Sequence, residues 1–238
     1  MKKVIIYSEI DWNFLDQRHH HLARYFASNG YHVVFVERVF SRIPKLRTLL
    51  KKIFRKHKTL PKNISKNIFL RRSIFLPNTL TIFFITNYLI WFFFERNKQQ
   101  DAYIYSFVDN PIIAGGVFKR YAKYEKSCFD IIHNWWEFPW NNSKHKMLVE
   151  NCLNVFDKII TDSPKIHKKL SQRKIDSYLM LPGVSENWIK DNIDKNFEKA
   201  KPVFFGNLRT NSDIGLIKTI SKLYGIDVYG IIDSELEN

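Results

Sequence analysis

Short apolar runs alternate along the chain with longer segments in which apolar residues recur at helical spacing. The apolar runs predict nine strands, over residues 4–7, 32–37, 68–76, 102–108, 129–133, 158–161, 178–181, 202–205 and 226–229. The helical spacing predicts six helices, over residues 15–28, 80–97, 112–124, 144–156, 164–172 and 214–224. Strands that alternate with helices favour a parallel sheet, and unbroken apolar runs are typical of strands buried on both faces. We therefore expect an α/β fold with a Rossmann-like, doubly wound parallel sheet.

A polar, charged segment over residues 184–201 separates two unequal parts of the chain. Seven strand candidates precede this segment, and only two strands and one helix follow it. We expect residues 1–183 to form a first Rossmann-like domain and residues 202–238 to begin a second one that is incomplete. A stub of about forty residues can hardly close a core of its own. We expect it to pack against the first domain or a partner, or to be the remainder of a longer domain.

Positive charge is concentrated in one part of the chain. The sequence has 38 Lys and Arg against 23 Asp and Glu, a net charge of +15. No acid occurs from Arg38 to Phe94, and the thirteen basic residues of this segment leave the remainder close to neutral. We therefore expect a basic insert over residues 38–73 in an otherwise ordinary domain.

Residues 41–58 of this insert have the pattern of a basic amphipathic helix, with Leu46, Leu49, Leu50 and Ile53 on one face. Such helices favour anionic lipid surfaces. A solvated helix packed on the sheet is the alternative, whereas nucleic acid is disfavoured because no recognisable binding module accompanies the insert. We expect an anionic membrane surface, and no nucleic acid, as a partner.

The uncharged segment from Ile74 to Phe94 is 21 residues long and passes a crude filter for a membrane span. However, Pro77, Asn78, Thr79 and other polar residues interrupt it. About sixteen apolar-rich residues remain, fewer than the roughly 20 that a span needs. The pattern favours a buried or partly surface-bound helix over a span.

The cysteine count and the N-terminal residues bear on the cellular compartment. Cys128 and Cys152 are the only cysteines, which excludes a disulfide scaffold and a Cys-rich zinc module and fits a reducing environment. The first apolar run is four residues long and is closed by Glu9 and Asp11, so no export signal is expected. We expect a cytoplasmic protein.

The most promising residues for chemistry follow the predicted strand 129–133. This strand ends at His133, and open α/β sheets bind ligands at the carboxyl ends of their strands. Histidine suits proton transfer near neutral pH, and Glu137 could orient His133 or act as a base itself. Trp135 and two further tryptophans offer flat faces for a sugar ring or a lipid surface. A strand-end histidine beside a structural aromatic cluster is the alternative interpretation.

Two further segments carry weaker signals. Arg18 and His20 lie at a helix start, where an anionic group is favoured, whereas three consecutive histidines point in different directions and make a poor metal site. Gly183 and Gly206 each follow a strand and would let the backbone approach a ligand closely. Arg209 is suited to a diphosphate. The sequence has neither GxGxxG nor a P-loop, which argues against a typical dinucleotide fold and a Walker ATPase.

Taken together, four segments resemble the two-Rossmann-domain (GT-B) glycosyltransferases of bacteria, in particular the large retaining family that uses nucleotide sugars. The segments are QRHHHLARYFASNGYHVVFVE at 17–37, FDKIITDSPKIHKKL at 156–170, LMLPGVSENW at 179–188 and VFFGNLRTNSD at 203–213. The resemblance covers nearly the whole chain.

The resemblance implies roles for particular residues. The first domain would bind the acceptor, with Asp11, Arg18, His20 and Trp135 as its contacts, and His133 and Glu137 would lie near the reacting centre. The donor contacts would be Gly183, Val184, Gly206, Asn207 and Arg209. The nucleotide sugar would be a substrate, with no cofactor and no metal.

The sequence also departs from that family. Ser8-Glu9-Ile10-Asp11 stands where a glycine-rich turn is common, and no lysine follows the arginine of the donor turn. The paired glutamates that hold the donor would lie beyond residue 238. We expect a glycosyltransferase, peripheral on the inner face of the cell membrane, that acts on a lipid-linked or cell-surface polysaccharide acceptor. The alternative is a non-catalytic acceptor-binding or scaffold half that needs a donor-domain partner chain. A hydrolase that uses His133 is the third hypothesis, but no Gly-x-Ser-x-Gly motif supports it.

Overall fold

The computed structural model divides the chain into two units, Met1–Pro182 and Gly183–Asn238. The residues that it describes are 1–39, 66–76, 81–132, 134, 136–137, 143–181, 203–205, 214–225 and 227–229. The predicted helix at 41–58 and most of the basic insert lie outside these residues. Each unit is described by itself.

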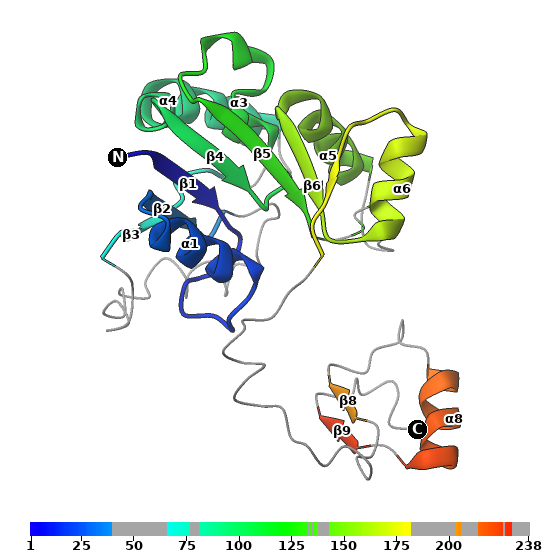
Figure 1. Cartoon of the computed structure of the whole chain (residues 1–238). Coiled ribbons are helices and arrows are strands. Elements are labelled where there is room, and N and C mark those ends of the chain that lie inside the picture. Colours follow the sequence, from blue (N-terminus) through cyan, green and yellow to red (C-terminus); the bar gives the residue numbers. More distant parts are fainter. Residues whose placement is uncertain are drawn as a thin grey trace. The chain divides into compact units, whose positions relative to one another are not determined.

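The first unit contains a seven-stranded sheet with the order β3-β2-β1-β4-β5-β6-β7, in which every described pair is parallel (Figure 1). Its strands are β1 (Lys3–Tyr7), β2 (His32–Glu37), β3 (Ile68–Arg72), β4 (Ala102–Ser106), β5 (Lys126–Ile131), β6 (Lys158–Thr161) and β7 (Tyr178–Leu179). The chain runs outward from β1 to β3 and then returns to place β4 on the other side of β1. The strand order therefore reverses between β1 and β4.

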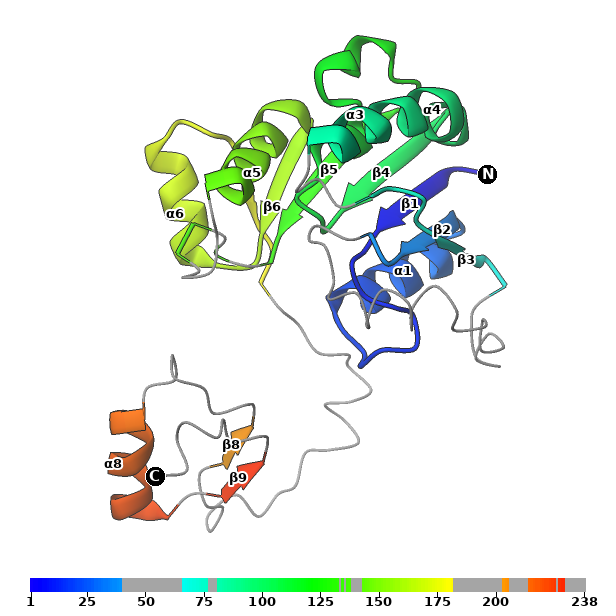
Figure 2. The same ribbon diagram turned by 180° about the vertical axis from the view of Figure 1, so that it is seen from behind.

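Helices cover both faces of this sheet, α1 on one face and the other helices on the opposite face (Figures 1 and 2). They are α1 (Arg18–Ser28), α3 (Thr81–Ile90), the π-helical turn η1 (Trp91–Glu95), α4 (Arg96–Lys98), the 3₁₀ helices η2 (Pro111–Ala114) and η3 (Gly116–Tyr121), α5 (Ser143–Val155) and α6 (Pro164–Gln172). Right-handed crossovers produce this division, because the direction of winding reverses after β3. The expected Rossmann-like, doubly wound α/β sheet is confirmed.

The sheet has a hydrophobic core on each face because successive side chains of a strand point to opposite sides. Val4 and Ile6 of β1 join the core beneath α1, where Ala23 lies. Ile5 and Tyr7 join the other core, which contains Trp91, Ile112, Val149 and Leu170. The apolar runs without polar alternation are thus buried on both sides, as their pattern predicted.

The predicted helix over residues 112–124 is wrong. Two short 3₁₀ helices, η2 and η3, occupy most of this segment. Gly115 and Gly116 separate them, with φ values of 87° and 52°. Left-handed backbone of this kind ends a helix, and glycine adopts it without strain.

Most of the uncharged segment belongs to the continuous helical stretch α3–η1–α4 over residues 81–98. Asn87, Trp91 and Glu95 of this stretch are buried, and a helix packed into the protein lies where a buried or partly surface-bound helix was expected. Among the helices that the structure describes, none combines the length and the apolar character needed to cross a bilayer.

The second unit has a βαβ arrangement. Strand β8 (Val203–Phe205) pairs in parallel with β9 (Asp227–Tyr229), and α8 (Ile214–Tyr224) connects them. These elements lie where the sequence predicts two strands and a helix.

Candidate functional site

The candidate site lies at the carboxyl ends of β1, β4 and β5, where the strand order reverses. The register places Tyr7 of β1 beside Ser106 of β4, so both strands end at the same level. Ligands of open α/β sheets bind in the crevice outside the carboxyl ends of the strands at such a reversal. Three described segments follow these strands: the loop 8–17 between β1 and α1, residues 107–110 after β4, and Ile132 after β5.

A buried ion pair connects the start of α1 to β5. Arg18 donates from Nε to Oδ2 of Asp130 at 2.9 Å and from Nη2 to Oδ1 at 3.3 Å. Tyr105 of β4 donates to the same carboxylate at 2.6 Å, and Nη1 of Arg18 donates to the carbonyl of Met180 at 2.7 Å. The Asp130 side chain is completely buried, and this burial raises its pKa although Tyr105 and Arg18 favour the carboxylate form. These hydrogen bonds fix the N-terminus of α1 against β5. Arg18 therefore has a positioning role, in addition to its predicted contact with the acceptor.

The loop 8–17 is held by a second ion pair at the end of β2. Arg38, with a φ of 61°, donates from Nε and Nη2 to the carboxylate of Asp11 at 2.5 and 2.9 Å. The backbone N–H of Trp12 donates to Oε2 of the buried Glu37 at 3.1 Å. Asp11 is therefore already paired, and its predicted contact with the acceptor would have to share this carboxylate with Arg38.

His20 lies inside the protein at the first turn of α1. Its ring packs edge-on against Trp12, with 5.1 Å between ring centroids, and stacks on Phe35 at 5.7 Å. The backbone N–H of Gln17 donates to its Nδ1 at 3.0 Å, and Nε2 has no hydrogen-bond partner among the described residues. Burial lowers the pKa of His20, so the ring is neutral at pH 7. A neutral, buried ring suits a hydrogen bond to a hydroxyl better than the anionic contact that the sequence predicted.

Two buried polar residues follow β4 at this edge, and the sequence analysis missed them. Asp109 is 1% exposed and Asn110 is 2% exposed. Asn110 accepts from the N–H of Ile112 at 3.0 Å and so begins η2. Their signal was present, because a polar pair directly after a buried strand resembles the arrangement that singled out His133.

Glu137 is the described member of the predicted catalytic pair, and it is half exposed. Nζ of Lys165, from α6, donates to its Oε2 at 2.8 Å. This hydrogen bond and another with Asn134 lower the pKa of Glu137. A general base works best with a pKa near the operating pH, so an ionised Glu137 is better suited to binding or orienting than to removing a proton.

The remaining predicted site residues lie outside the described part of the chain: His133, Trp135, Gly183, Val184, Gly206, Asn207 and Arg209. Described residues close to two of them in the sequence show where the preceding strands end. Ile131 ends β5 at the same level as Thr161 ends β6, and Phe205 ends β8 immediately before Gly206.

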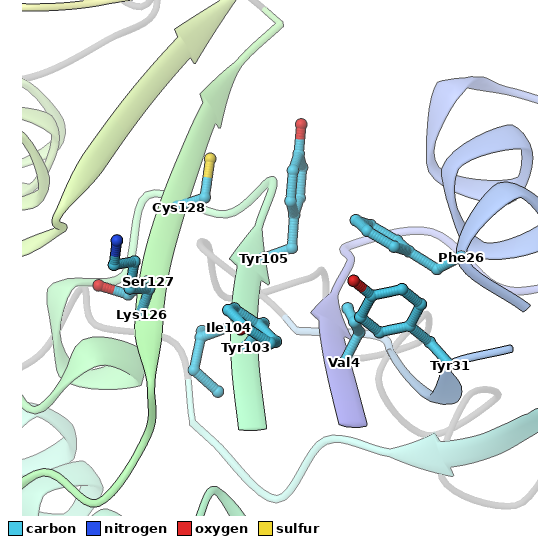
Figure 3. Close-up of a pocket in the computed structure, with 9 residues that line it drawn as sticks. All are labelled: Val4, Phe26, Tyr31, Tyr103, Ile104, Tyr105, Lys126, Ser127 and Cys128. Carbon is cyan, nitrogen blue, oxygen red and sulfur yellow. The ribbon is translucent and has the colours of Figure 1, made fainter. Parts of the chain in front are cut away.

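An apolar cavity of about 310 Å³ lies between α1 and strands β4 and β5 (Figure 3). Phe26 and Tyr31 line one side, and Tyr103, Tyr105 and Cys128 line the other. Burial raises the pKa values of the Tyr105 phenol and the Cys128 thiol, so both stay protonated at neutral pH. The cavity therefore offers aromatic surface, and its thiol is not activated as a nucleophile. It adjoins the site through Tyr105, whose hydroxyl reaches Asp130.

The described residues include no cluster of side chains suited to a metal ion. No group of three or more His, Cys, Asp and Glu side chains is placed among them to hold a metal ion. His19, for example, packs its ring against Phe107 with 3.8 Å between centroids.

Comparison with known proteins gives one kind of match. No protein-family model and no curated protein matches the chain. Nineteen chains of solved structures do match, among them the crystal structure of a glycosyltransferase from Rickettsia africae ESF-5. That alignment covers 99% of this chain and 70% of the Rickettsia chain, with 12% sequence identity and a TM-score of 0.51. At such low identity the likeness shows the fold alone: this chain has a fold that a glycosyltransferase also has.

Proposed function

We propose that this chain is a glycosyltransferase that moves a sugar from a nucleotide-sugar donor to a lipid-linked or cell-surface polysaccharide acceptor. The observation that carries the proposal is the likeness to the Rickettsia glycosyltransferase over 99% of this chain. The crevice at the reversal of strand order supports it, because substrates of open α/β sheets bind there. In the reaction, an acceptor oxygen bonds to the anomeric carbon of the sugar as the bond to the diphosphate breaks, and a nucleoside diphosphate leaves.

The proposed roles follow from chemistry and position. His133 follows the last residue of β5 by two positions in the sequence. It accepts the proton of the acceptor hydroxyl. Glu137 holds sugar hydroxyls or orients His133, because its lowered pKa makes it a weak base. Gly206, Asn207 and Arg209 bind the donor diphosphate, and Gly183 and Val184 are further donor contacts. The nucleotide sugar is the substrate, and neither cofactor nor metal is required.

Acceptor binding is assigned to the loop 8–17 and the start of α1. Asp11 and Arg18 hold these segments in place through their ion pairs. Trp135 and His20 complete the proposed contacts. Phe14 and Leu15 of the same loop are exposed although they are large and apolar. Apolar side chains beside a sugar site suit an acceptor with a lipid part, which supports the lipid-linked alternative.

A second candidate is a non-catalytic acceptor-binding half that works with a donor-domain partner chain. Leu223 and Tyr224 of α8 are exposed, and large apolar residues on a helix are usually covered by another element. An enzyme and such a half differ in whether added donor is consumed by the purified chain.

The test uses an extract of cells that lack the gene, which supplies acceptors and any partner chain. Purified protein and a mixture of sugar-labelled nucleotide sugars are added, and label in the lipid and polymer fractions is counted. We expect label transfer only when the protein is present. Equal incorporation without the protein would contradict the proposal, and transfer by the protein with acceptor but without extract would exclude the non-catalytic alternative.

A further inference from the structure

Large apolar side chains are exposed on two neighbouring elements of the first unit, at the face of the sheet opposite α1. Phe93 is 64% exposed and Val117 is 77% exposed. We refer to the exposed residues Ile85, Leu89, Phe92, Phe93, Val117 and Phe118 as the α3–η3 surface. Figures 1 and 2 both show the loop that contains η3 beside α3. A contiguous patch of this kind on a folded protein marks an interaction site.

Direct contacts fix α3 and η3 together. The backbone N–H of Val117 donates to the hydroxyl of Tyr88 at 3.2 Å, and the Tyr88 ring packs edge-on against Phe118 at 5.2 Å. Gly116 makes this approach possible, because a Cβ there would lie 2.3 Å from the Tyr88 hydroxyl oxygen. The surface is therefore a fixed feature of the fold.

The helix α3–η1 exposes large apolar residues although it also packs apolar residues, among them Trp91, into the core. Its inward side contains Trp91 and also Asn87 and Glu95, whose side chains accept hydrogen bonds from Leu76 and Arg71. Its outward side presents Leu89, Phe92 and Phe93. A helix on the surface of a soluble protein normally directs polar residues outward, so this outward side is built for contact with an apolar phase or partner.

Two arginines lie beside aromatic rings of η1 and η3, the elements that carry part of this surface. The guanidinium of Arg96 lies 4.3 Å from the centroid of the Phe92 ring, and that of Arg120 lies 4.7 Å from the centroid of the Tyr121 ring. Residues 81–125 contain five Lys and Arg, of which Lys98 and Lys119 are paired with Glu95 and Asp157, and two exposed acids, Asp101 and Glu125. The surface thus combines aromatic rings with a positive rim.

We propose that the α3–η3 surface docks on the anionic face of a lipid bilayer. Phe93, Leu89 and Val117 enter the boundary between headgroups and acyl chains, and Arg96 and Arg120 pair with lipid phosphates. Aromatic and aliphatic side chains with flanking cations have this arrangement in interfacial helices. Docking of a second copy is disfavoured, because it would bring two positive rims together. The mode is contact with one leaflet, since the opposite side of α3–η1 is packed into the protein.

The test measures sedimentation of the full chain with vesicles of phosphatidylcholine, with and without phosphatidylglycerol. We expect binding to the anionic vesicles, and Leu89→Gln/Phe93→Gln should weaken it about tenfold or more, since two apolar side chains no longer enter the bilayer. Val117→Ser tests η3 independently and should weaken binding as well. Arg96→Gln/Arg120→Gln should remove much of the preference for anionic over neutral vesicles.

Tyr25→Gln is the matched control, because Tyr25 is 63% exposed on α1, on the opposite face of the sheet. It should bind vesicles like the wild type, and melting curves establish that every variant is folded. Unchanged binding of the two apolar variants would overturn the proposal, as would an equal loss in Tyr25→Gln. A dimer that Leu89→Gln/Phe93→Gln dissociates, without vesicle binding by the wild type, would overturn it too. Vesicle binding requires neither donor nor acceptor, so its failure would leave the proposed transferase activity standing.

Discussion

Arg18 and Asp130 are 112 positions apart in the sequence, yet their side chains form a paired hydrogen bond beneath the candidate site, with 2.9 Å from Nε to Oδ2. The pair joins the first helix to the fifth strand across β4. It lies where the strand order reverses, and Tyr105 completes it. A buried charge pair, in addition to apolar packing, therefore fixes α1 and β5 relative to each other at the candidate site.

Arg18→Ala should destabilise the protein strongly. It leaves the Asp130 carboxylate buried with Tyr105 as its remaining partner, and breaking a buried pair costs about 3 kcal/mol or more. Urea unfolding at pH 7 measures this difference in the free energy of unfolding. Arg24→Ala is the matched control from the same helix, because Arg24 and its partner Asp16 are both 48% exposed, and an exposed pair contributes about 1 kcal/mol or less. Equal effects of the two variants would show that the buried pair has no special structural role.

His20 should make stability depend on pH. Its folded pKa lies below the value of about 6.5 in an unfolded chain. Its contribution to stability is therefore fully present above pH 6.5 and is lost as the pH falls through 6.5 towards the lower folded pKa. Protonation of Nδ1 also removes the acceptor for the Gln17 N–H.

Unfolding free energies of wild type and His20→Gln, compared at pH 8 and pH 5, measure this effect. The variant should lose less stability than the wild type across that range. His21→Gln, an exposed neighbour on the same helix, should keep the pH dependence of the wild type. An identical pH dependence of His20→Gln and wild type would rule out His20 as its source.

His133 and Glu137 should differ in their effect on sugar transfer. Loss of a proton-transfer group costs about 10²–10⁴-fold in rate, which is expected for His133→Ala in the labelled-sugar assay. Glu137→Gln should cost less than tenfold, because an ionised Glu137 contributes binding rather than proton removal. Lys165→Gln breaks the same ion pair but keeps the Glu137 carboxylate. It therefore separates the effect of the carboxylate charge from the effect of the ion pair that holds it. Full activity of folded His133→Ala would mean that this strand-end histidine is structural.

The fold was accessible from the sequence because it rests on local patterns. The run from Val33 to Val36 is apolar at every position and could form only a buried strand in this context. The helix expected at 112–124 failed because Gly115 and Gly116 adopt positive φ, which the apolar spacing around them does not reveal.

The site was only partly accessible because its geometry depends on pairing across the chain. Asp130 lies in a predicted strand, but its pairing with Arg18 depends on the order of the strands in the sheet, which the sequence pattern does not reveal. His20 was expected to meet an anion at a helix start, whereas packing of Trp12 and Phe35 buries it. Asp109 was overlooked although it directly follows the predicted strand 102–108. The roles of His133, Trp135 and the donor turn stay predictions, since they lie outside the described residues.

The reaction class itself is tested most directly by the balance of products. Wild-type protein is incubated with acceptor-containing extract and nucleotide sugars labelled in the sugar or in the nucleotide, and each labelled product is quantified. A glycosyltransferase places the sugar label in the acceptor and releases one nucleoside diphosphate for each sugar transferred. We expect this one-to-one ratio, dependent on the protein and lost with His133→Ala. Release of free sugar without a labelled acceptor, or of nucleoside monophosphate, would contradict the proposed function.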